Sequence, residues 1–510
     1  MTRIRANVLG VFLAAAAFVA SALISSVVFE RIPHLEDEFA LLWQADVMAD
    51  GAMSTPSPEF PDSFMIPFVI DANGIRFGKY PPGWPAALSL GARVGEAWLV
   101  QALLSAASVW LLFRLGQKLL DTPTGLLAGA LALFSPFFLL QSGSLLAHMF
   151  SLFLTLAFVH AWLDLFLRTG GSNVPKIILV LVAGLSLGLL ALTRPWTALA
   201  VAAPFGIHAV VLLCKGLRRN LWTLVALGLL AAAVAALLFA WQAALTGNAF
   251  QEAYSLWWEY DLVGFGPGHG PVEGGHSLNL AWFNTLFSLQ IASHDVFGWP
   301  YLSWLFLPVG FWALRRKPGA WLVFAILPSL ILFYLAYWTG AWLFGPRYYF
   351  EAMPALVVGT AAGLRELQRL IQQQGWRRWL GKAGVWLAGV LVAGNLIFYL
   401  PLRLRGMYAL YGIQRSHIQA VLELNLEPGL LIVHSARWMP YANLALLAPP
   451  FSDYGFDVAL NQGSETDAVL ASGYHANGEQ VYHYYPDHPD SFRIELPADG
   501  DVNAVDEYDR

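Results

Sequence analysis

The sequence is poor in cysteine and in charge. A single cysteine, Cys214, excludes an internal disulfide and a zinc site built from cysteine thiolates. Charged residues make up only 12% of the 510 residues, against about 25% in soluble domains. The net charge of −5 gives no reason to expect nucleic acid as a partner. The chain is instead 57% hydrophobic and carries 21 tryptophans, which predicts an integral membrane protein with many crossings.

Long apolar runs predict about eleven transmembrane α-helices. Each run approaches the roughly 20 apolar residues that one crossing needs. The runs are 8–29, 97–118, 123–140, 145–167, 176–193, 196–213, 221–245, 296–313, 319–339, 348–364 and 384–401. The stretch 82–95 is too short and too rich in proline for a span, so we expect an interfacial or re-entrant segment there.

Basic residues predict the orientation of these spans. With a cytoplasmic N-terminus, every cluster of arginine and lysine falls in a cytoplasmic loop, as the positive-inside rule requires. Loops 31–96 and 246–295 and the chain from residue 402 then lie outside the membrane. The first run is longer than the roughly 7–15 apolar residues of a signal peptide, which favours an uncleaved span over a cleaved signal.

The composition changes after residue 401. The segment "SHIQAVLELNL" has helical spacing, "GLLIVHS" predicts a short buried strand, and "EQVYHYYPDHPDSFRIEL" predicts one or two strands. We therefore predict a helical membrane domain of residues 1–401 and a small extracytoplasmic α/β lobe of residues 402–510. A lobe of this size has a limited core of its own, so we expect it to lean on the membrane domain.

An acidic triplet, Glu36-Asp37-Glu38 in "RIPHLEDEFALLW", follows the first apolar run. One interpretation is structural: Pro33 opens an amphipathic helix on the membrane surface, and acids in its first turn favour the helix dipole. The other is functional, because a carboxylate there could take a proton from a hydroxyl. Lys79, which ends the same external loop, could then stabilise a phosphate leaving group.

The order of these features resembles the GT-C superfamily of integral membrane glycosyltransferases. A long apolar helix precedes an acidic "DE" pair, and "KYPP" closes the first external loop. The segments "SPFFLLQSGSLLAHMFSLFLTLAF", "WQAALTGNAFQEAY" and "LFGPRYYFEAMPAL" are similar to later elements of these proteins. In style the chain resembles the protein O-mannosyltransferases and the lipid A aminoarabinose transferases, which are of glycosyltransferase family 39 type. The resemblance covers about residues 8–400 in outline.

The resemblance implies a polyprenyl-phosphate-linked sugar donor, an extracytoplasmic active site and inversion at the sugar carbon. Asp37 would be the catalytic base, and Glu38 would orient the acceptor or hold the loop. Lys79 and Arg347 would contact the donor phosphate. His148 stands where many relatives carry an acid, so a polar substrate-binding role is expected for it. A bacterial inner membrane is the location that the family style implies.

Four further residues complete the expected site. Arg194 in "LTRPW" lies at an outer boundary, where a charge is costly and usually functional. We expect it to bind the donor phosphate or another part of the substrate, with snorkelling to the interface as the alternative. Tyr80 and Tyr348 neighbour the two phosphate contacts and are expected to bind substrate. His269 is a further substrate-binding candidate in the glycine-rich loop 246–295, which we expect to act as a flexible lid.

No cofactor is expected, but the same loop leaves a metal open as an alternative. His269, Glu273, His276, His294 and Asp295 could together hold a divalent ion. They lack a compact ligand spacing such as His-Glu-x-x-His, so the metal is the weaker interpretation.

Two other functions fit parts of the sequence. A transporter or flippase for lipid-linked glycans would place binding groups near the bilayer midplane, whereas the charges here gather at one surface. A non-catalytic assembly factor would dock through residues 402–510 and would not need Asp37. A glycosyltransferase acting on a hydroxyl of a protein, lipid or glycan accounts for more of these features.

Overall fold

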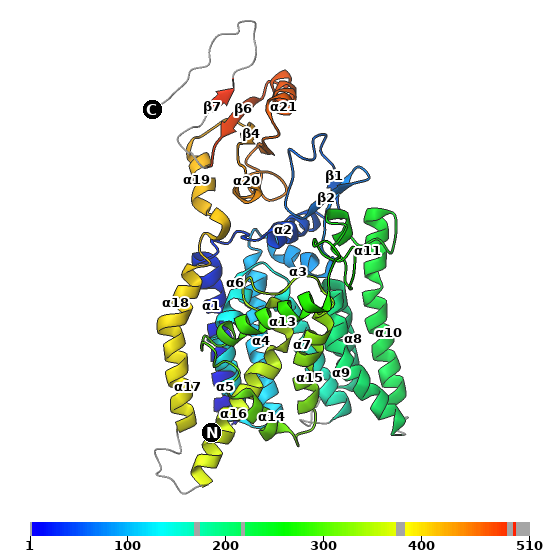
Figure 1. Cartoon of the computed structure of the whole chain (residues 1–510), viewed down its shortest axis with the longest axis vertical. Helices are drawn as coiled ribbons and strands as arrows, with labels where there is room; N and C mark the ends of the chain where they lie inside the picture. The colour runs from blue at the N-terminus through cyan, green and yellow to red at the C-terminus, as the bar shows by residue number, and fades with distance from the viewer. Residues whose placement is uncertain (1–2, 168–173, 216–219, 374–382, 487–492, 496–510) are drawn as a thin grey trace.

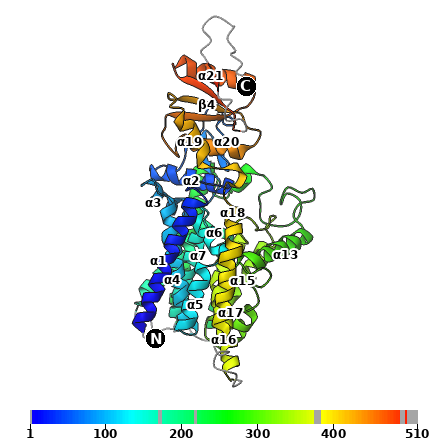
Figure 2. The same ribbon diagram turned by 90° about the vertical axis from the view of Figure 1, so that its left-hand side faces the viewer.

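The chain forms an elongated helical bundle with a small sheet-containing lobe at one end (Figure 1). The computed structural model describes residues 3–167, 174–215, 220–373, 383–486 and 493–495. The first helix starts at the end of the bundle far from the lobe and runs toward the lobe (Figures 1 and 2). The acidic triplet that follows this helix therefore lies at the lobe end.

Seven helical segments of the described residues are long and apolar enough to cross a membrane. They are α1 (Arg3–Val27), α4 (Trp98–Leu119), α7 (His148–Phe166), α8 (Lys176–Thr193), α9 (Pro195–Cys214), the pair α10 (Leu221–Ala235) and α11 (Leu237–Thr246), and the run of α17 (Ala383–Gly394), η4 (Asn395–Tyr399) and α18 (Leu400–Arg405). Helices α5 (Thr122–Leu133) and α6 (Pro136–Gly143), bent by 60°, make an eighth if the pair is one broken span. All of these coincide with predicted runs.

The other three predicted runs form shorter or more polar helices. Run 296–313 is helical only in α14 (Leu307–Leu314), and run 319–339 only in α15 (Ala320–Tyr334). Run 348–364 joins η2 (Arg347–Ala352) to α16 (Met353–Gln373), whose second half is polar. The count of eleven thus exceeds the number of long apolar helices, because apolar composition does not separate a full span from a short buried helix.

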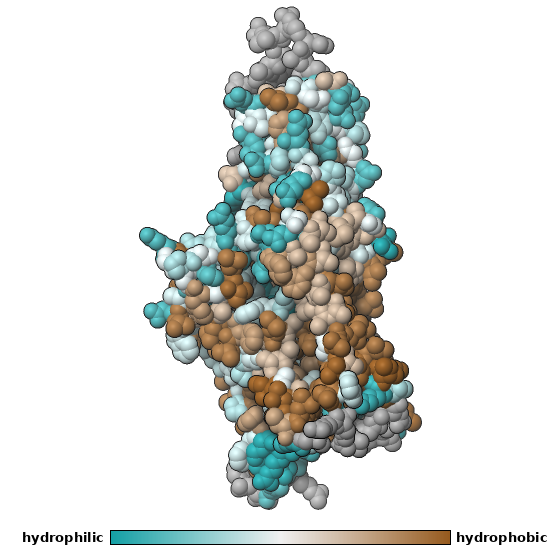
Figure 3. Space-filling model, turned by 90° about the vertical axis from the view of Figure 1, so that its right-hand side faces the viewer, coloured by the Kyte–Doolittle hydropathy of each residue, from teal (hydrophilic) through white to brown (hydrophobic). Residues whose placement is uncertain are grey.

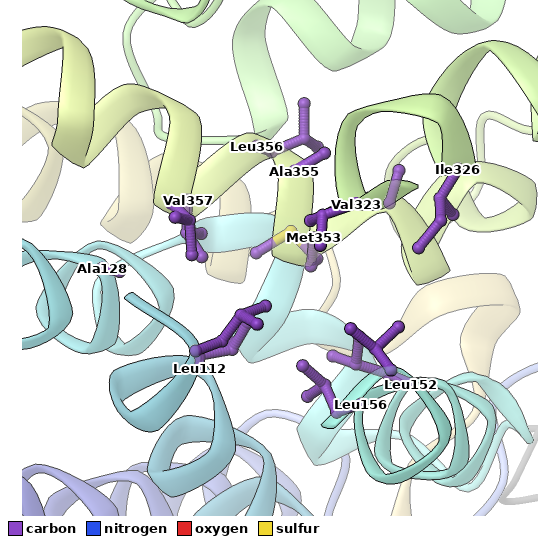
Figure 4. Close-up of a cluster of buried hydrophobic side chains, with 14 of the residues drawn as sticks. Leu112, Ala128, Leu152, Leu156, Val323, Ile326, Met353, Ala355, Leu356 and Val357 are labelled. Carbon is purple, nitrogen blue, oxygen red and sulfur yellow. The ribbon is translucent and has the colours of Figure 1, made fainter. Parts of the chain in front are cut away.

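Leucine, valine and alanine side chains from distant spans meet in the core of the bundle. Figure 4 shows part of this cluster, which α4, α5, α7, α15 and α16 share. The labelled side chains are Leu112, Ala128, Leu152, Leu156, Val323, Ile326, Met353, Ala355, Leu356 and Val357. The outside of the bundle is also rich in hydrophobic residues, whereas the lobe is mostly hydrophilic (Figure 3). This distribution is expected where lipid rather than water surrounds the helices.

Helix α2 (Glu36–Ala49) lies across the lobe end of the bundle, with α3 (Gly83–Ala92) packed against it (Figure 1). Between them the chain forms an antiparallel sheet in the order β1-β3-β2. Its strands are β1 (Thr55–Pro56), β2 (Val69–Ala72) and β3 (Ile75–Gly78). With 10 residues, α3 is too short to cross a membrane, in agreement with the interfacial segment predicted for 82–95.

The C-terminal lobe has the predicted α/β character. Its four-stranded sheet has the order β5-β4-β6-β7, in which β4 runs parallel to both neighbours and β7 is antiparallel to β6. The strands are β4 (Gly429–Val433), β5 (Phe456–Leu460), β6 (Gln480–Tyr484) and β7 (Arg493–Glu495), and the helices are α19 (Arg415–Glu423), α20 (Trp438–Ala445) and α21 (Ser464–Ala476). The predicted helix coincides with α19, the predicted buried strand with β4, and the last predicted strands with β6 and β7.

One buried cluster joins the lobe to the bundle. Phe39 and Trp43 of α2 pack in the same cluster as Ile413, Met439 and Ala442 of the lobe. Because burial of these side chains requires both parts, the lobe leans on α2, as its small size predicted.

Candidate active site

The start of α2 is held in place by Glu38. Its carboxylate accepts backbone hydrogen bonds from His34 (2.9 Å) and from the N-cap residue Leu35 (3.1 Å), and a third from Leu145 (2.6 Å). The bond to Leu35 is the half of a capping box that the acid at the third helical position supplies. Burial raises the pKa of Glu38 to about 7, although these three donors oppose the shift. Since Glu38 is 1% exposed and does not line the cavity described below, its geometry favours holding the loop over orienting an acceptor.

Asp37, one residue earlier, contacts side chains rather than backbone N–H groups. Its Oδ1 accepts a hydrogen bond from the Tyr80 hydroxyl (2.5 Å), and its Oδ2 lies 3.3 Å from Nη1 of Arg347. Burial works to raise the pKa of Asp37, but Arg347 and the Tyr80 hydroxyl outweigh it and hold the pKa below its ordinary value. Asp37 is therefore an ionised carboxylate at neutral pH.

A cavity of about 680 Å³ opens at this carboxylate, between the lobe end of the bundle and the lobe. Its polar lining comes from segments that are distant in the sequence. They are α2, the chain after β3, the start of α7, the α8–α9 junction, loop 246–276, η2 and the lobe. These lining side chains include Glu36, Asp37, Lys79, Tyr80, His148, Arg194, Asp261, Arg347, Tyr348, Tyr411 and Trp438. The cavity thus brings together seven of the nine predicted site residues, all except Glu38 and His269.

Lys79 is enclosed rather than free in the cavity. Its Nζ pairs with Asp261 at 3.0 Å and lies 4.0 Å from the ring centroid of Phe68 and 4.6 Å from that of Trp258. Burial lowers the pKa of Lys79, and Asp261 opposes this shift. Asp261 was not among the predicted site residues, because nothing in the sequence links it to a lysine 182 residues away.

Arg194 anchors a second polar group, deeper in the bundle. Its Nη1 pairs with Glu351 (2.7 Å) and lies 2.8 Å from Nδ1 of His148, while its Nη2 donates to the Tyr334 hydroxyl (3.0 Å). Arginine has no acceptor, so His148 Nδ1 must accept and the ring proton sits on Nε2. His148 therefore presents an N–H donor beside the cavity that it lines.

Glu351 is the other charged residue that the sequence analysis missed. It is 0% exposed and lies within η2, four residues after Arg347. A carboxylate at the start of an apolar run is costly unless it is paired, and this signal in "PRYYFEAM" marks it as a partner for a cation.

The lobe contributes its own wall to the cavity. Tyr411 and Trp438 line it from the lobe side, next to Glu36 of α2. Burial raises the pKa of Glu36 above its ordinary value, and the neighbouring charge of Asp37 adds to the shift. Glu36 thus belongs both to the first turn of α2, as the structural interpretation of the triplet expected, and to the cavity wall.

In loop 246–295, histidines and acids that could have held a metal have other partners. His276 Nε2 lies 2.9 Å from the Leu335 carbonyl, and Asp295 pairs with Arg403 of α18 at 3.1 Å. His269 lies outside the cavity lining. Across the described ranges, no three histidine, cysteine or acidic side chains gather as a metal site would need, so the five-residue metal hypothesis gains no support.

Comparisons with known proteins give a fold but no sequence family. No protein-family model and no curated protein matches the sequence. ArnT from Cupriavidus metallidurans bound to undecaprenyl phosphate is similar in structure, with a TM-score of 0.56, 13% identity and 92% of each chain covered. Its apo structure gives a TM-score of 0.55 and 14% identity, again over 92% of each chain.

An oligosaccharyltransferase from Archaeoglobus fulgidus, tethered to an acceptor peptide, is more distant. Its TM-score is 0.45 at 14% identity, over 85% of this chain and 62% of that one. The likeness to ArnT covers 92% of this chain, so it extends over the bundle and the lobe. The chain shares the fold of ArnT, which confirms the fold that the resemblance to the lipid A aminoarabinose transferases implied.

Proposed function

We propose that this protein is a membrane glycosyltransferase that moves a sugar from a polyprenyl-phosphate donor to an acceptor hydroxyl, with inversion at the sugar carbon. The observation that carries the proposal is the cavity itself. One ionised carboxylate, Asp37, lies there together with the cations Lys79, Arg194 and Arg347. A reaction that deprotonates a hydroxyl and expels a phosphate needs both kinds of group.

Asp37 is the base in this proposal. As the acceptor oxygen bonds to the anomeric carbon, its proton passes to Asp37. The bond from that carbon to the phosphate oxygen breaks on the opposite face, and its electron pair leaves with the polyprenyl phosphate. Attack opposite the leaving group inverts the sugar carbon.

Arg347, Arg194 and the Nε2–H of His148 are the groups suited to the donor phosphate. The two arginines offer planar forks that match phosphate oxygens, and His148 adds a neutral donor. Lys79 is 3% exposed and already paired with Asp261, so we assign it to the electrostatic field of the site rather than to direct phosphate contact. This changes the role that the resemblance implied for Lys79.

An apolar wall beside these groups suits the lipid part of the donor. Leu238, Phe239 and Trp241 of α11 line the cavity, and Phe239 is 47% exposed at the outside of the bundle. The solved structure of ArnT with undecaprenyl phosphate supports a donor of this class. We therefore place the polyprenyl chain along α11, with its phosphate directed toward Arg347.

The acceptor enters from the lobe side in this proposal, past Glu36, Tyr411 and Trp438. Because the basic clusters favour a cytoplasmic N-terminus, this side is extracytoplasmic, and the lobe of residues 402–510 lies outside the membrane. A bacterial inner membrane is the location that we propose for the protein.

The test uses the purified protein and two variants. Native mass spectrometry first identifies any polyprenyl-phosphate sugar that copurifies with the wild type. Consumption of that lipid in reconstituted membranes is then compared between wild type, Asp37→Asn and Glu59→Gln, an exposed acid of the same external loop. We expect Asp37→Asn to lose at least about 100-fold in rate, the lower end of general-base contributions, and Glu59→Gln to retain the wild-type rate.

Two outcomes would reject the proposal. A folded Asp37→Asn variant that consumes donor at the wild-type rate would remove Asp37 as the base. A bound lipid-linked oligosaccharide that crosses the membrane unchanged would favour the transporter or flippase.

A further inference from the structure

Every cation that lines the cavity in the described part of the chain is paired with a carboxylate. Lys79 pairs with Asp261 at 3.0 Å, Arg194 with Glu351 at 2.7 Å, and Arg347 with Asp37 at 3.3 Å. A phosphate that enters this cavity therefore finds no unpaired positive charge among these residues. To form an ion pair here, the phosphate must either share a cation with its carboxylate or take the cation from it.

Two of the three pairs are held by further contacts. Asp261 also accepts hydrogen bonds from the Tyr337 hydroxyl (3.0 Å) and the Trp338 indole (2.9 Å), and both partners of the Lys79 pair are at most 3% exposed. In the Arg194 pair, the Glu351 side chain is 0% exposed. Breaking either pair would leave a buried charge without compensation, which is strongly unfavourable.

The pair between Arg347 and Asp37 is different. Its single contact of 3.3 Å is longer than the roughly 2.7–2.9 Å of a strong charge-assisted hydrogen bond. The two side chains are 15% and 22% exposed, the most open pair of the three on average. Among the described residues, Arg347 makes no other ion pair, so its remaining N–H groups can donate to a new acceptor.

The hydrogen bond from Tyr80 can hold the Asp37 carboxylate in place when Arg347 leaves it. The Tyr80 hydroxyl donates to Oδ1 of Asp37 at 2.5 Å, while Arg347 contacts Oδ2. Loss of Arg347 therefore frees one oxygen and leaves the other anchored. Oδ2 is then the oxygen that can take a proton.

We infer that the donor phosphate and Asp37 compete for Arg347, so that binding of the donor itself uncovers the base. This inference rests on the proposed function, because it takes Asp37 as the base and Arg347 as a phosphate contact. The guanidinium forms two parallel hydrogen bonds to the phosphate, which are stronger than its single long contact with Asp37. Oδ2 then accepts the acceptor proton while Arg347 holds the charge that grows on the departing polyprenyl phosphate. Donor must bind before the acceptor can react.

The inference is tested with undecaprenyl phosphate as the probe and its dissociation constant as the measurement. Wild type, Asp37→Asn, Arg347→Gln and the double variant form a double-mutant cycle. Asp37→Asn removes the competitor, so we expect it to bind the lipid about five- to tenfold more tightly. In the Arg347→Gln background the same change should alter binding by less than about twofold.

Glu36→Gln is the matched control. It removes the same charge from the neighbouring cavity residue, which makes no ion pair with Arg347. Its effect measures ordinary repulsion between a carboxylate and a phosphate, and we expect it to stay below about twofold because of solvent screening. Thermal unfolding checks that each variant is folded, and Arg347→Met replaces Arg347→Gln if the latter is not.

Three results would overturn the inference. If Asp37→Asn tightens binding of the lipid equally with and without Arg347, the gain comes only from removing the repulsion between the carboxylate and the phosphate. Weaker or unchanged binding by Asp37→Asn would indicate that Arg347 bridges both groups at once. No binding of the lipid to wild type would overturn the donor proposal as well, whereas binding without coupling overturns only the competition for Arg347.

Discussion

Asp37 and Glu38 are neighbours in the chain, yet their carboxylates meet opposite environments. Asp37 faces a tyrosine hydroxyl and an arginine, which hold its pKa low, whereas Glu38 is buried against backbone N–H groups and has a pKa of about 7. Successive helical residues point about 100° apart, so one turn of α2 supplies both groups. The acid that lines the cavity and the acid that holds the helix start are therefore distinct at the scale of single residues.

The pKa of Glu38 predicts how stability depends on pH. Glu38 in the folded protein keeps a proton that the unfolded chain, at its ordinary pKa of 4.5, has released. The folded state binds more protons in between, so this group's contribution to the free energy of unfolding falls as pH rises from about 4.5 to about 7. The total change is about 3 kcal/mol, at 1.36 kcal/mol per pKa unit.

Thermal unfolding across this pH range measures the effect. We expect the slope to be smaller in Glu38→Gln, whose side chain does not titrate, and unchanged in Glu59→Gln, whose side chain is exposed. Equal slopes in wild type and Glu38→Gln would show that folding does not shift the pKa of Glu38.

The charged residues Asp37, Lys79 and Arg194 could be predicted from the sequence because each stands out within its own segment. Asp37, Lys79 and Arg194 are charges beside apolar runs, and such charges are rarely without function. Asp261 carries no comparable signal, since it lies in a polar loop where an acid is ordinary. Which carboxylate pairs with which cation depends on the fold. The sequence therefore indicated the three cations but not that each of them is paired with a carboxylate.

At the scale of elements, residues 246–276, the first part of loop 246–295, cover the cavity and are held to the chain after β3. Its short helix α12 (Tyr254–Trp257) and Asp261 line the cavity, and Asp261 ties the loop to Lys79 after β3. The sequence analysis expected a flexible lid from the glycines, several of which do adopt positive φ, Gly264 to Gly275 among them. The Lys79–Asp261 pair is one of the contacts that hold this loop over the site, together with the hydrogen bonds from Tyr337 and Trp338 to Asp261.

Breaking that pair should open the loop. Lys79→Met leaves the Asp261 charge without its cation, and loss of one partner of a buried pair costs about 3–5 kcal/mol. We expect a lower unfolding temperature and faster proteolysis within residues 246–276. Adding Asp261→Asn should restore part of both losses, because the double variant buries no unpaired charge.

Glu259→Gln, an exposed position of the same loop, serves as the control and should match wild type. If Lys79→Met is as stable and as resistant to protease as wild type, the loop is held by its aromatic contacts instead.

The bundle and the lobe share one site at the scale of the whole molecule. Bundle residues supply the carboxylate and the cations, and the lobe closes the cavity with Tyr411 and Trp438. The α/β character of the lobe followed from its alternating apolar segments, but its place over α2 did not, because packing between distant segments leaves no periodic signal. The division at residues 401 and 402 stays a prediction that falls within α18, and the cavity takes residues from both sides of it.

In the proposed function, the donor and the acceptor reach this shared site from different sides. Trp438→Ala removes an aromatic side chain from the lobe wall, so we expect the KM for the acceptor to rise about tenfold, from the loss of about 1.4 kcal/mol of ring contact. Undecaprenyl phosphate should bind within about twofold of wild type. Trp222→Ala, at a position 78% exposed on the bundle, is the control. A parallel loss of lipid affinity would place the donor, not the acceptor, beside the lobe.

The separation of 310 residues between Asp37 and Arg347 also bears on how the protein is made. Asp37 follows α1, whereas η2, with Arg347, comes only after α15. During synthesis Asp37 can therefore meet Tyr80 long before it meets Arg347 or the lobe. Every product of premature termination between residues 80 and 347 lacks the cation that pairs with Asp37, so only a chain translated past η2 can complete the site.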